Sequence, residues 1–248
     1  MVNTTQLEKY LKQDRMPTIY CPGCGIGLAT KAMLSAFDQL EFNQTNTAVI
    51  SGIGCTARVP GYLALDSINA IHGRALPIAQ GLKATKPDLN VVVISGDGDL
   101  LGIGGGHLLH AVRRGMNITT ILINNSIYGL TGGQYSPASP TGTVSPTSPE
   151  GSPDRPMRVK ELVTSYPDTF YARTSCFHID HMEKVIKQAL EWDKFGFVEV
   201  ISPCPTNFFR RLGFKTPTEI YQHLKKEYKL TRGEQVDLAP NELGIIKT

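Results

Sequence analysis

Two clusters of residues in this chain have types and spacings that suit metal chemistry, and they differ in kind. Residues 96–99 read Gly-Asp-Gly-Asp, and Asn124 and Asn125 follow further along the chain. Carboxylate and amide oxygens are ligands that Mg²⁺ prefers, and protein-bound Mg²⁺ usually keeps phosphate oxygens in its shell. The second cluster consists of cysteines, whose thiolates bind zinc or iron–sulfur clusters.

The aspartate cluster follows a β-branched, apolar run at residues 90–95, and the two asparagines end a second such run at 118–124. Runs of this kind are typical of strands buried on both faces of a parallel sheet. Glycines beside the aspartates let the backbone turn and approach a ligand closely. The pattern predicts a Mg²⁺–diphosphate site. A dinucleotide site is disfavoured, because the glycines of residues 102–106 come after the aspartates and no acidic residue ends the next strand.

Four of the five cysteines lie in settings that favour ligation. Cys21 and Cys24 belong to a Cys-Pro-Gly-Cys-Gly motif, while Cys55 and Cys204 each follow a predicted strand. Cys176 lacks such a setting and is predicted to be a small core residue. Spacing alone leaves three alternatives for the other four: an iron–sulfur cluster, a tetrahedral zinc site and a Cys-x-x-Cys redox pair.

Alternating strands and helices must bring these residues together. Strands are predicted at residues 46–51, 90–95, 118–124, 169–174 and 197–202, and apolar stripes at helical spacing lie within 26–40, 78–82, 108–112 and 182–190. This alternation predicts an α/β fold with a doubly wound, mostly parallel sheet. Right-handed crossovers then place the carboxyl ends of the strands, and the candidate residues that follow them, on one edge.

The composition fits one domain over residues 1–248. Apolar residues make up 41% and charged residues 19%, and the net charge of +3 is too small to argue for a nucleic-acid partner. We expect basic pairs at 210–211 and 225–226 to form a solvated face. The chain has no run of 18 apolar residues, so no membrane span is expected. The polar N-terminus lacks the apolar core of a signal peptide, which predicts a cytoplasmic protein.

Two segments depart from the alternation of strands and helices. Residues 136–158 hold six of the sixteen prolines, so they cannot form a long helix. A segment of this kind is either a disordered linker or an ordered lid beside the site, and both alternatives stay open. Residues 229–248 form a polar C-terminal tail, which we expect to pack on a partner.

With both clusters in view, the chain resembles the β subunit of a 2-oxoacid:ferredoxin oxidoreductase, whose diphosphate site is a thiamine-diphosphate motif. The resemblance runs from Cys21 to about Lys229. Its markers are the motifs CPGCG, SGIGC, IHGRA, GDGD, NN, YGLT and CPT, which begin at residues 21, 51, 71, 96, 124, 128 and 204. It implies a thiamine-diphosphate-binding domain that carries thiamine diphosphate, Mg²⁺ and one [4Fe–4S] cluster.

The resemblance also assigns residues to each cofactor. Mg²⁺ would be bound by Asp97, the Asn125 side chain and the Ile127 carbonyl. The cluster would be bound by Cys21, Cys24, Cys55 and Cys204. The thiamine diphosphate would be contacted by Ile53, Gly54, Cys55, Thr56, His72, Gly98, Asp99, Asn125, Gly129, Leu130 and Thr131. His72 would be the catalytic contact at the reactive end of the cofactor. Arg74 either binds an anionic substrate or anchors its loop.

The implied reaction is oxidative decarboxylation of a 2-oxoacid with coenzyme A, with electrons passing through the cluster to ferredoxin. Gly132 stands where some relatives have lysine, and this form, with residues 207–211, is similar to the 2-oxoglutarate branch, so succinyl-CoA is the expected product. Pyruvate and branched-chain acids remain open. An α subunit must supply the pyrimidine-binding domain. Two rival hypotheses are a non-redox thiamine-dependent decarboxylase with structural zinc and a non-catalytic metal-binding scaffold.

Overall fold

The central sheet has the predicted α/β character. The computed structural model describes residues 4–248. Eight strands pair in the order β2-β1-β3-β4-β8-β7-β10-β9. All neighbours are parallel except β7 and β10. Their bounds are β1 Thr47–Ser51, β2 Asp66–Asn69, β3 Asn90–Gly96, β4 Ile118–Asn124, β7 Thr169–Ser175, β8 Phe195–Ile201, β9 Lys229–Glu234 and β10 Glu242–Lys247; a separate hairpin pairs β5 Ile127–Tyr128 with β6 Gln134–Tyr135.

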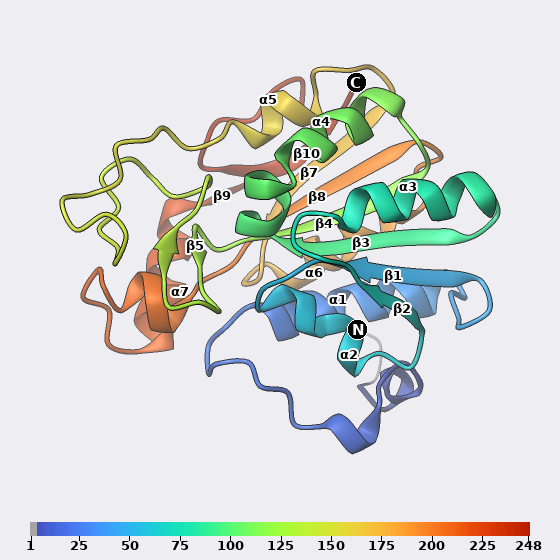
Figure 1. Cartoon of the computed structure of the whole chain (residues 1–248), viewed down its shortest axis with the longest axis horizontal. Helices are drawn as coiled ribbons and strands as arrows, with labels where there is room; N and C mark the ends of the chain where they lie inside the picture. The colour runs from blue at the N-terminus through green and yellow to red at the C-terminus, as the bar shows by residue number, and fades with distance from the viewer. Residues whose placement is uncertain (1–3) are drawn as a thin grey trace.

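Helices cover both faces of the sheet, as Figure 1 shows. Their bounds are α1 Ile26–Gln39, α2 Val59–Tyr62, α3 Ala75–Thr85, α4 Gly105–Arg114, α5 Val159–Val163, α6 Ile179–Leu190 and α7 Pro217–Glu227. Successive side chains of β3 point to opposite faces of the sheet, and each face has its own hydrophobic core. Val92 and Ile94 pack with α1 and α6 on one face, while Val91 and Val93 pack with α3 and α4 on the other. None of these helices is long and apolar enough to cross a bilayer.

The strand ends position the candidate residues. Parallel register aligns the last residues of β3 with β4 and those of β4 with β8. The loops that carry Cys55, Asp97, Asn125 and Cys204 therefore leave the same edge of the sheet. The chain runs from β1 outward to β2 and then returns to β3, so the boundary between β1 and β3 is a topological switch point, where ligands bind in folds of this class.

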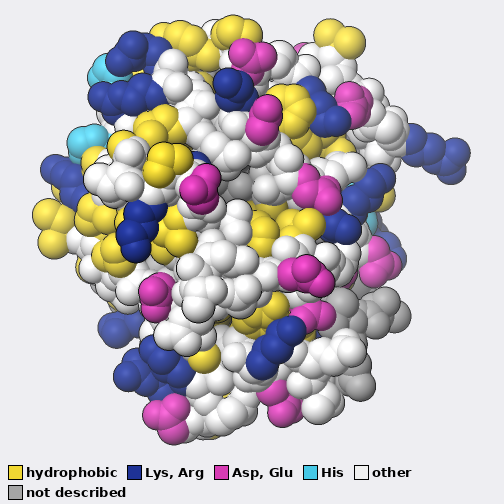
Figure 2. Space-filling model, turned by 90° about the vertical axis from the view of Figure 1, so that its right-hand side faces the viewer, with side chains coloured by type: hydrophobic (Ala, Val, Ile, Leu, Met, Phe, Trp, Pro, Cys, Tyr) yellow, Lys and Arg dark blue, Asp and Glu magenta, His cyan; other side chains and the backbone are white. Residues whose placement is uncertain are grey.

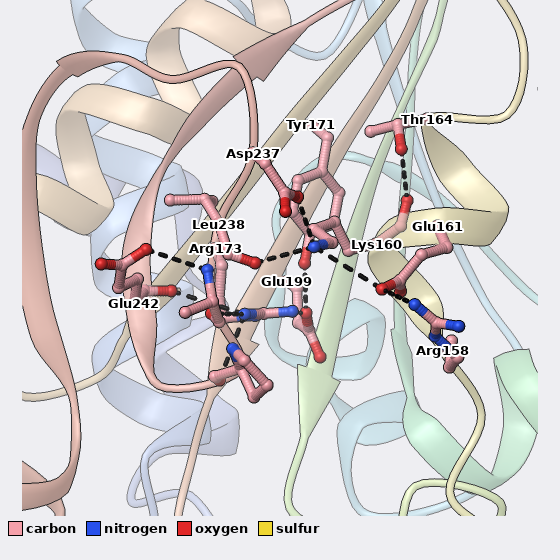
Figure 3. Close-up of polar contacts among 12 residues, drawn as sticks. Arg158, Lys160, Glu161, Thr164, Tyr171, Arg173, Glu199, Asp237, Leu238 and Glu242 are labelled. Atoms are coloured by element: carbon pink, nitrogen blue, oxygen red, sulfur yellow. Dashed lines mark hydrogen bonds and ion pairs between the residues drawn. The ribbon is translucent and has the colours of Figure 1, made fainter.

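The C-terminal segment, expected as a polar tail that packs on a partner, contains two strands that the sequence did not predict. Residues 229–248 form β9 and β10, which extend the chain's own sheet. The buried guanidinium of Arg173 donates to Glu199 and to the carbonyls of Ala239 and Pro240. Lys160 donates to Asp237 and to the Leu238 carbonyl, also drawn in Figure 3. The sequence could not show these contacts, because they join residues far apart in the chain.

His181 on α6 makes stability sensitive to acid. Burial, with smaller contributions from His178 and Lys184, lowers the pKa of His181 to about 4. Its Nδ1 lies 2.9 Å from Thr174 Oγ1. The unfolded chain binds a proton near pH 6.5 and the folded chain does not, so stability should fall as pH drops from about 6.5 to about 4 and then level off. Urea unfolding across this range should show a shallower decline for His181→Asn than for the wild type.

Candidate functional site

Asp97 is the centre of the predicted Mg²⁺ site. It directly follows β3, and only 1% of its surface is exposed. Burial raises the pKa of its carboxyl to about 6, although the Ser136 hydroxyl and the backbone N–H groups of Gly98 and Asn125 donate to it. Among the described residues no Lys, Arg or His side chain forms a salt bridge with Asp97. A buried carboxylate without a protein cation fits a bound metal ion.

Asn125 lies in a tight turn against Asp97. Its Oδ1 accepts from the N–H of Ile127 at 3.2 Å, and Ser126 adopts a positive φ of 60°. Asn124 braces the turn, because its Oδ1 accepts from Ser126 and its Nδ2 donates to Glu199 at 2.7 Å. An amide oxygen beside the buried carboxylate supplies the second type of ligand that Mg²⁺ prefers. Ile127 itself is buried at the start of the β5–β6 hairpin.

The proline-rich segment is an ordered cover over this site. Ser136 and Ser139 are both 2% exposed. The Ser136 hydroxyl donates to Asp97, and the Ser139 hydroxyl donates to the Ser126 carbonyl at 2.5 Å. The sequence suggested a lid or a linker, and these contacts support the lid. The individual serines were missed, because no local pattern indicates which serines of a serine-rich loop face the site.

Gly98 and Asp99 were predicted to lie against a diphosphate, and both have protein neighbours here. The Tyr128 ring covers Gly98, since a Cβ at this position would lie 2.1 Å from Tyr128 Cε1. Asp99 is 2% exposed. Its carboxylate accepts from the N–H groups of Ile53 and Gly73 at 3.0 and 2.7 Å and from the Ser95 hydroxyl at 2.6 Å. Only the main chain of Asp99 is therefore left to face a phosphate.

His72 is the remaining partner of Asp99. Its Nδ1 lies 2.5 Å from Asp99 Oδ1, and its side chain is 37% exposed against 1% for Asp99. A carboxylate oxygen accepts hydrogen bonds, so Nδ1 donates to Asp99, and Nε2 is the ring nitrogen left for another partner. The Tyr128 ring stands edge-on to the imidazole at a centroid distance of 6.2 Å. Arg74 anchors this loop by donating to the His72 carbonyl at 3.2 Å.

A cavity of about 380 Å³ opens next to these residues. It is lined by Arg15, Gly52, Ile53, Gly54, Ala57, Arg58, Gly61, Asn69 and Leu130. Thr56, predicted to line the thiamine pocket, is buried at 3% exposure. Thr131 is exposed and donates to Gln134 at 2.5 Å. Arg58, whose charge acts on Cys55, was missed because an arginine inside a turn gives no signal in the sequence.

The four cysteines singled out in the sequence gather on the same edge. Burial raises the pKa of Cys24 to about 12, with further increases from Cys204, Cys55 and Cys21. Burial is also the main cause of the raised pKa of Cys55 and of Cys204, and neighbouring thiols of this group raise both values further. Cys176 stands apart as a fully buried core residue. In residues 4–248 no group of three or more His, Cys, Asp or Glu side chains is arranged to hold a single metal ion.

Gly129 connects the two candidate sites. It lies a few residues after Asn125, and a Cβ there would meet Cys204 Sγ at 3.4 Å and Cys55 Sγ at 3.7 Å. The Asn207 amide donates to its carbonyl at 2.8 Å. The chain thus passes from the predicted Mg²⁺ ligands to two cysteine sulfurs within one short hairpin.

Comparison with known proteins agrees with this geometry. Residues 51–200 match the family model described as thiamine pyrophosphate enzyme, C-terminal TPP binding domain. The chain is 40% identical to the 2-oxoglutarate synthase subunit KorB of Methanothermobacter marburgensis, over 95% of this chain and 82% of that protein. It is 38% identical to 2-oxoacid:ferredoxin oxidoreductase 2, subunit beta, of Aeropyrum pernix, over 75% of this chain and 60% of that protein. The chain belongs to the 2-oxoacid:ferredoxin oxidoreductase β-subunit family.

A solved member of this family shares the whole architecture of this β subunit. The 2-oxoglutarate:ferredoxin oxidoreductase from Magnetococcus marinus, solved with 2-oxoglutarate, coenzyme A and succinyl-CoA bound, aligns with a TM-score of 0.87 and 32% identity. The alignment covers 98% of this chain and 84% of that chain. The predictions of family and of fold class are confirmed, and membership makes this β subunit part of an oxidoreductase complex.

Proposed function

We propose that this β subunit holds Mg²⁺–thiamine diphosphate and one [4Fe–4S] cluster, and that its complex converts 2-oxoglutarate and coenzyme A to succinyl-CoA while reducing ferredoxin. One observation carries this proposal. The buried carboxylate of Asp97 and the four cysteines lie at the same edge of the sheet, and Gly129 lies next to two of the cysteine sulfurs. The names of the relatives support 2-oxoglutarate as the substrate and ferredoxin as the electron acceptor.

The donor sets fit these groups. Asp97 and the Asn125 amide offer the hard oxygen ligands that Mg²⁺ takes together with phosphate. Four thiolates are also the ligands of tetrahedral zinc. The names of the relatives favour a cluster, because reduction of ferredoxin needs an electron carrier and zinc has no redox chemistry. A four-iron cluster distributes its thiolates around a larger body. Cys55 and Cys204 both contact Gly129, so such a cluster would lie beside the diphosphate hairpin.

The residues of this chain have separate tasks. Bound thiamine diphosphate supplies the electron sink for decarboxylation. Asp97 and Asn125 fix the diphosphate end, and Ser136 excludes water above them. His72, oriented by Asp99, presents Nε2 toward the reactive end of the cofactor. Ile53, Ile71, Ile103 and Leu130 are 44–74% exposed around this edge. Apolar side chains exposed in this way mark a surface that a partner covers, here the α subunit.

Arg58 is the residue we assign to substrate selection. 2-Oxoglutarate carries a second carboxylate that pyruvate lacks, and the cavity beside Ile53 is apolar except for Asn69 and the cationic Arg15 and Arg58. Arg58→Met should raise KM for 2-oxoglutarate at least tenfold and change KM for 2-oxobutyrate less than threefold, since one charge-assisted contact is worth about 1.5–3 kcal/mol. Equal changes for both acids would show that Arg58 does not bind the distal carboxylate. Lys86→Met, on the exposed far end of α3, is the matched control.

One experiment tests the proposed function as a whole. The β subunit, co-expressed with its α subunit and purified without oxygen, should contain four irons and four sulfides, bind thiamine diphosphate, and reduce ferredoxin fastest with 2-oxoglutarate. Faster turnover with pyruvate would contradict the substrate assignment. Colourless protein with bound zinc would favour the non-redox decarboxylase. Absence of thiamine diphosphate binding would favour the non-catalytic scaffold.

A further inference from the structure

We propose that residues 210–226, here called the basic segment, form the docking surface for ferredoxin and select a ferredoxin with an acidic face. This inference rests on the proposed function, because it assumes that the neighbouring cysteines hold the cluster. It assigns a role to the basic pairs that the sequence analysis treated as an ordinary solvated face.

The basic segment concentrates the positive charge of the chain. It contains five lysine or arginine residues and one acidic residue, so its net charge of +4 exceeds the +3 of the whole protein. All five basic side chains are exposed: Arg210, Arg211, Lys215, Lys225 and Lys226. The single acidic residue, Glu219, accepts from the backbone N–H of Lys215 at 2.9 Å. A surface of one sign steers oppositely charged partners toward it.

This segment lies against the cysteine loops. Cys204 immediately precedes the short helical turn η5 (Pro205–Phe209), which leads into the basic segment. Pro217, the first residue of α7, packs on Gly23 between Cys21 and Cys24, since a Cβ on Gly23 would lie 2.5 Å from Pro217 Cβ. Tyr221, one turn further along α7, packs against the same hydrophobic core cluster as Cys24.

Cys21 marks the place where electrons can leave. It is the exposed member of the four cysteines, whereas Cys24, Cys55 and Cys204 are partly buried. An electron carrier therefore comes closest to the bound cluster at the loop of Cys21. The basic segment borders this loop through the contact between Pro217 and Gly23.

A shallow apolar groove lies along α7, beside Lys225. It has a volume of about 370 Å³ and is lined by Phe177, Pro217, Thr218, Tyr221, Gln222 and Lys225. A small apolar centre with a charged rim is the composition expected of a weak electron-transfer interface. The face seen in Figure 2, which views the molecule from the side where the strands begin, instead intersperses positive and negative side chains.

Electron transfer at this surface needs no further reactant. A cluster held by the four cysteines would give up one electron, and the ferredoxin cluster would take it, so the first would be oxidised and the second reduced by one electron. No covalent bond or proton moves in this step. The basic segment contributes only the attraction that brings the two clusters together.

Charge reversal tests the docking surface in the anaerobic α/β complex. The variant combines Lys215→Glu, Lys225→Glu and Lys226→Glu, and its control combines Lys86→Glu and Arg113→Glu at the far ends of α3 and α4. The probe is a purified acidic 2[4Fe–4S] ferredoxin. At low ionic strength the variant should bind oxidised ferredoxin at least tenfold more weakly by calorimetry and show the same increase in KM for ferredoxin. The difference should shrink as salt screens the charges. Reduction of methyl viologen, iron content and gel-filtration size should not change.

Several results would overturn the assignment. Ferredoxin affinity equal to that of the control variant would place the docking site elsewhere. Loss of α/β association would show that the basic segment binds the α subunit. A parallel loss of methyl viologen reduction and of iron would show that the basic segment supports the cluster and is not a docking surface. A wild-type complex without a cluster would refute the proposed function, and the docking surface with it; the first three results refute the docking surface alone.

Discussion

Asp99→Ala is expected to lower the turnover of the assembled enzyme at least a hundredfold and to destabilise the β subunit. The carboxylate accepts from Ile53, Gly73, His72 and Ser95 in a buried setting. Each buried donor left without a partner costs about 1–3 kcal/mol. Losing the carboxylate therefore loosens the loops after β1, β2 and β3 at once. It also releases the His72 ring from the orientation that exposes Nε2. Turnover and thermal unfolding measure the two effects.

Asp99→Asn separates structure from charge. The amide oxygen can still accept from Ile53, Gly73 and His72, while the amide nitrogen can donate to the Ser95 hydroxyl. This variant should fold with nearly wild-type stability and lose less activity than Asp99→Ala. Nitrogen NMR of His72 in the cofactor-free β subunit should report a protonated Nδ1 in the wild type and in Asp99→Asn. If Asp99→Ala keeps the same tautomer and the same turnover, Asp99 does not position His72. Asp193→Ala, which removes an exposed carboxylate in the loop between α6 and β8, is the control.

The sequence predicted the parts of this site that depend on strand ends. Strands β3 and β4 occur where the β-branched runs predicted them. Their parallel pairing then requires Asp97 and Asn125 to meet at one edge. The grouping of Cys55 with Cys204 follows from the same argument, because β1 and β8 end at that edge as well. These predictions depend on the spacing of apolar residues and on the right-handedness of crossovers, and both can be inferred from the order of residues in the chain.

Apolar spacing and crossover handedness could not predict the directions of side chains or the contacts between distant residues. Asp97 and Asp99 look equivalent in a Gly-Asp-Gly-Asp motif, yet the Asp97 carboxylate accepts from Ser136 and the Asp99 carboxylate accepts from Gly73. The backbone turns between them into a helical segment, so the two side chains leave in different directions. The C-terminal strands were missed for a related reason. Strand β9 is exposed and polar, and β10 pairs only through contacts with the distant β7.

Cys204→Ser is the second change with a large expected effect, because it should separate the two inorganic sites. Burial raises the pKa of the Cys204 thiol, and backbone N–H groups of Asn207, Phe208 and Thr206 oppose that rise. These donors favour a thiolate, the form that binds iron. A serine hydroxyl remains protonated there and is a poor ligand. We expect loss of most of the iron and at least a hundredfold slower ferredoxin reduction.

The diphosphate site should survive the same change. Cys204 follows β8, whereas Asp97 and Asn125 follow β3 and β4, and the Cys204 sulfur lies close to Gly129 in the β5–β6 hairpin. Calorimetry with Mg²⁺ should therefore give a Kd for thiamine diphosphate within threefold of the wild type. Cys176→Ser, which alters a buried cysteine outside the group, should keep both iron and cofactor. Equal loss of iron and of thiamine diphosphate binding in Cys204→Ser would mean that Gly129 couples the sites into one folding unit. Unchanged iron content would exclude Cys204 from the cluster.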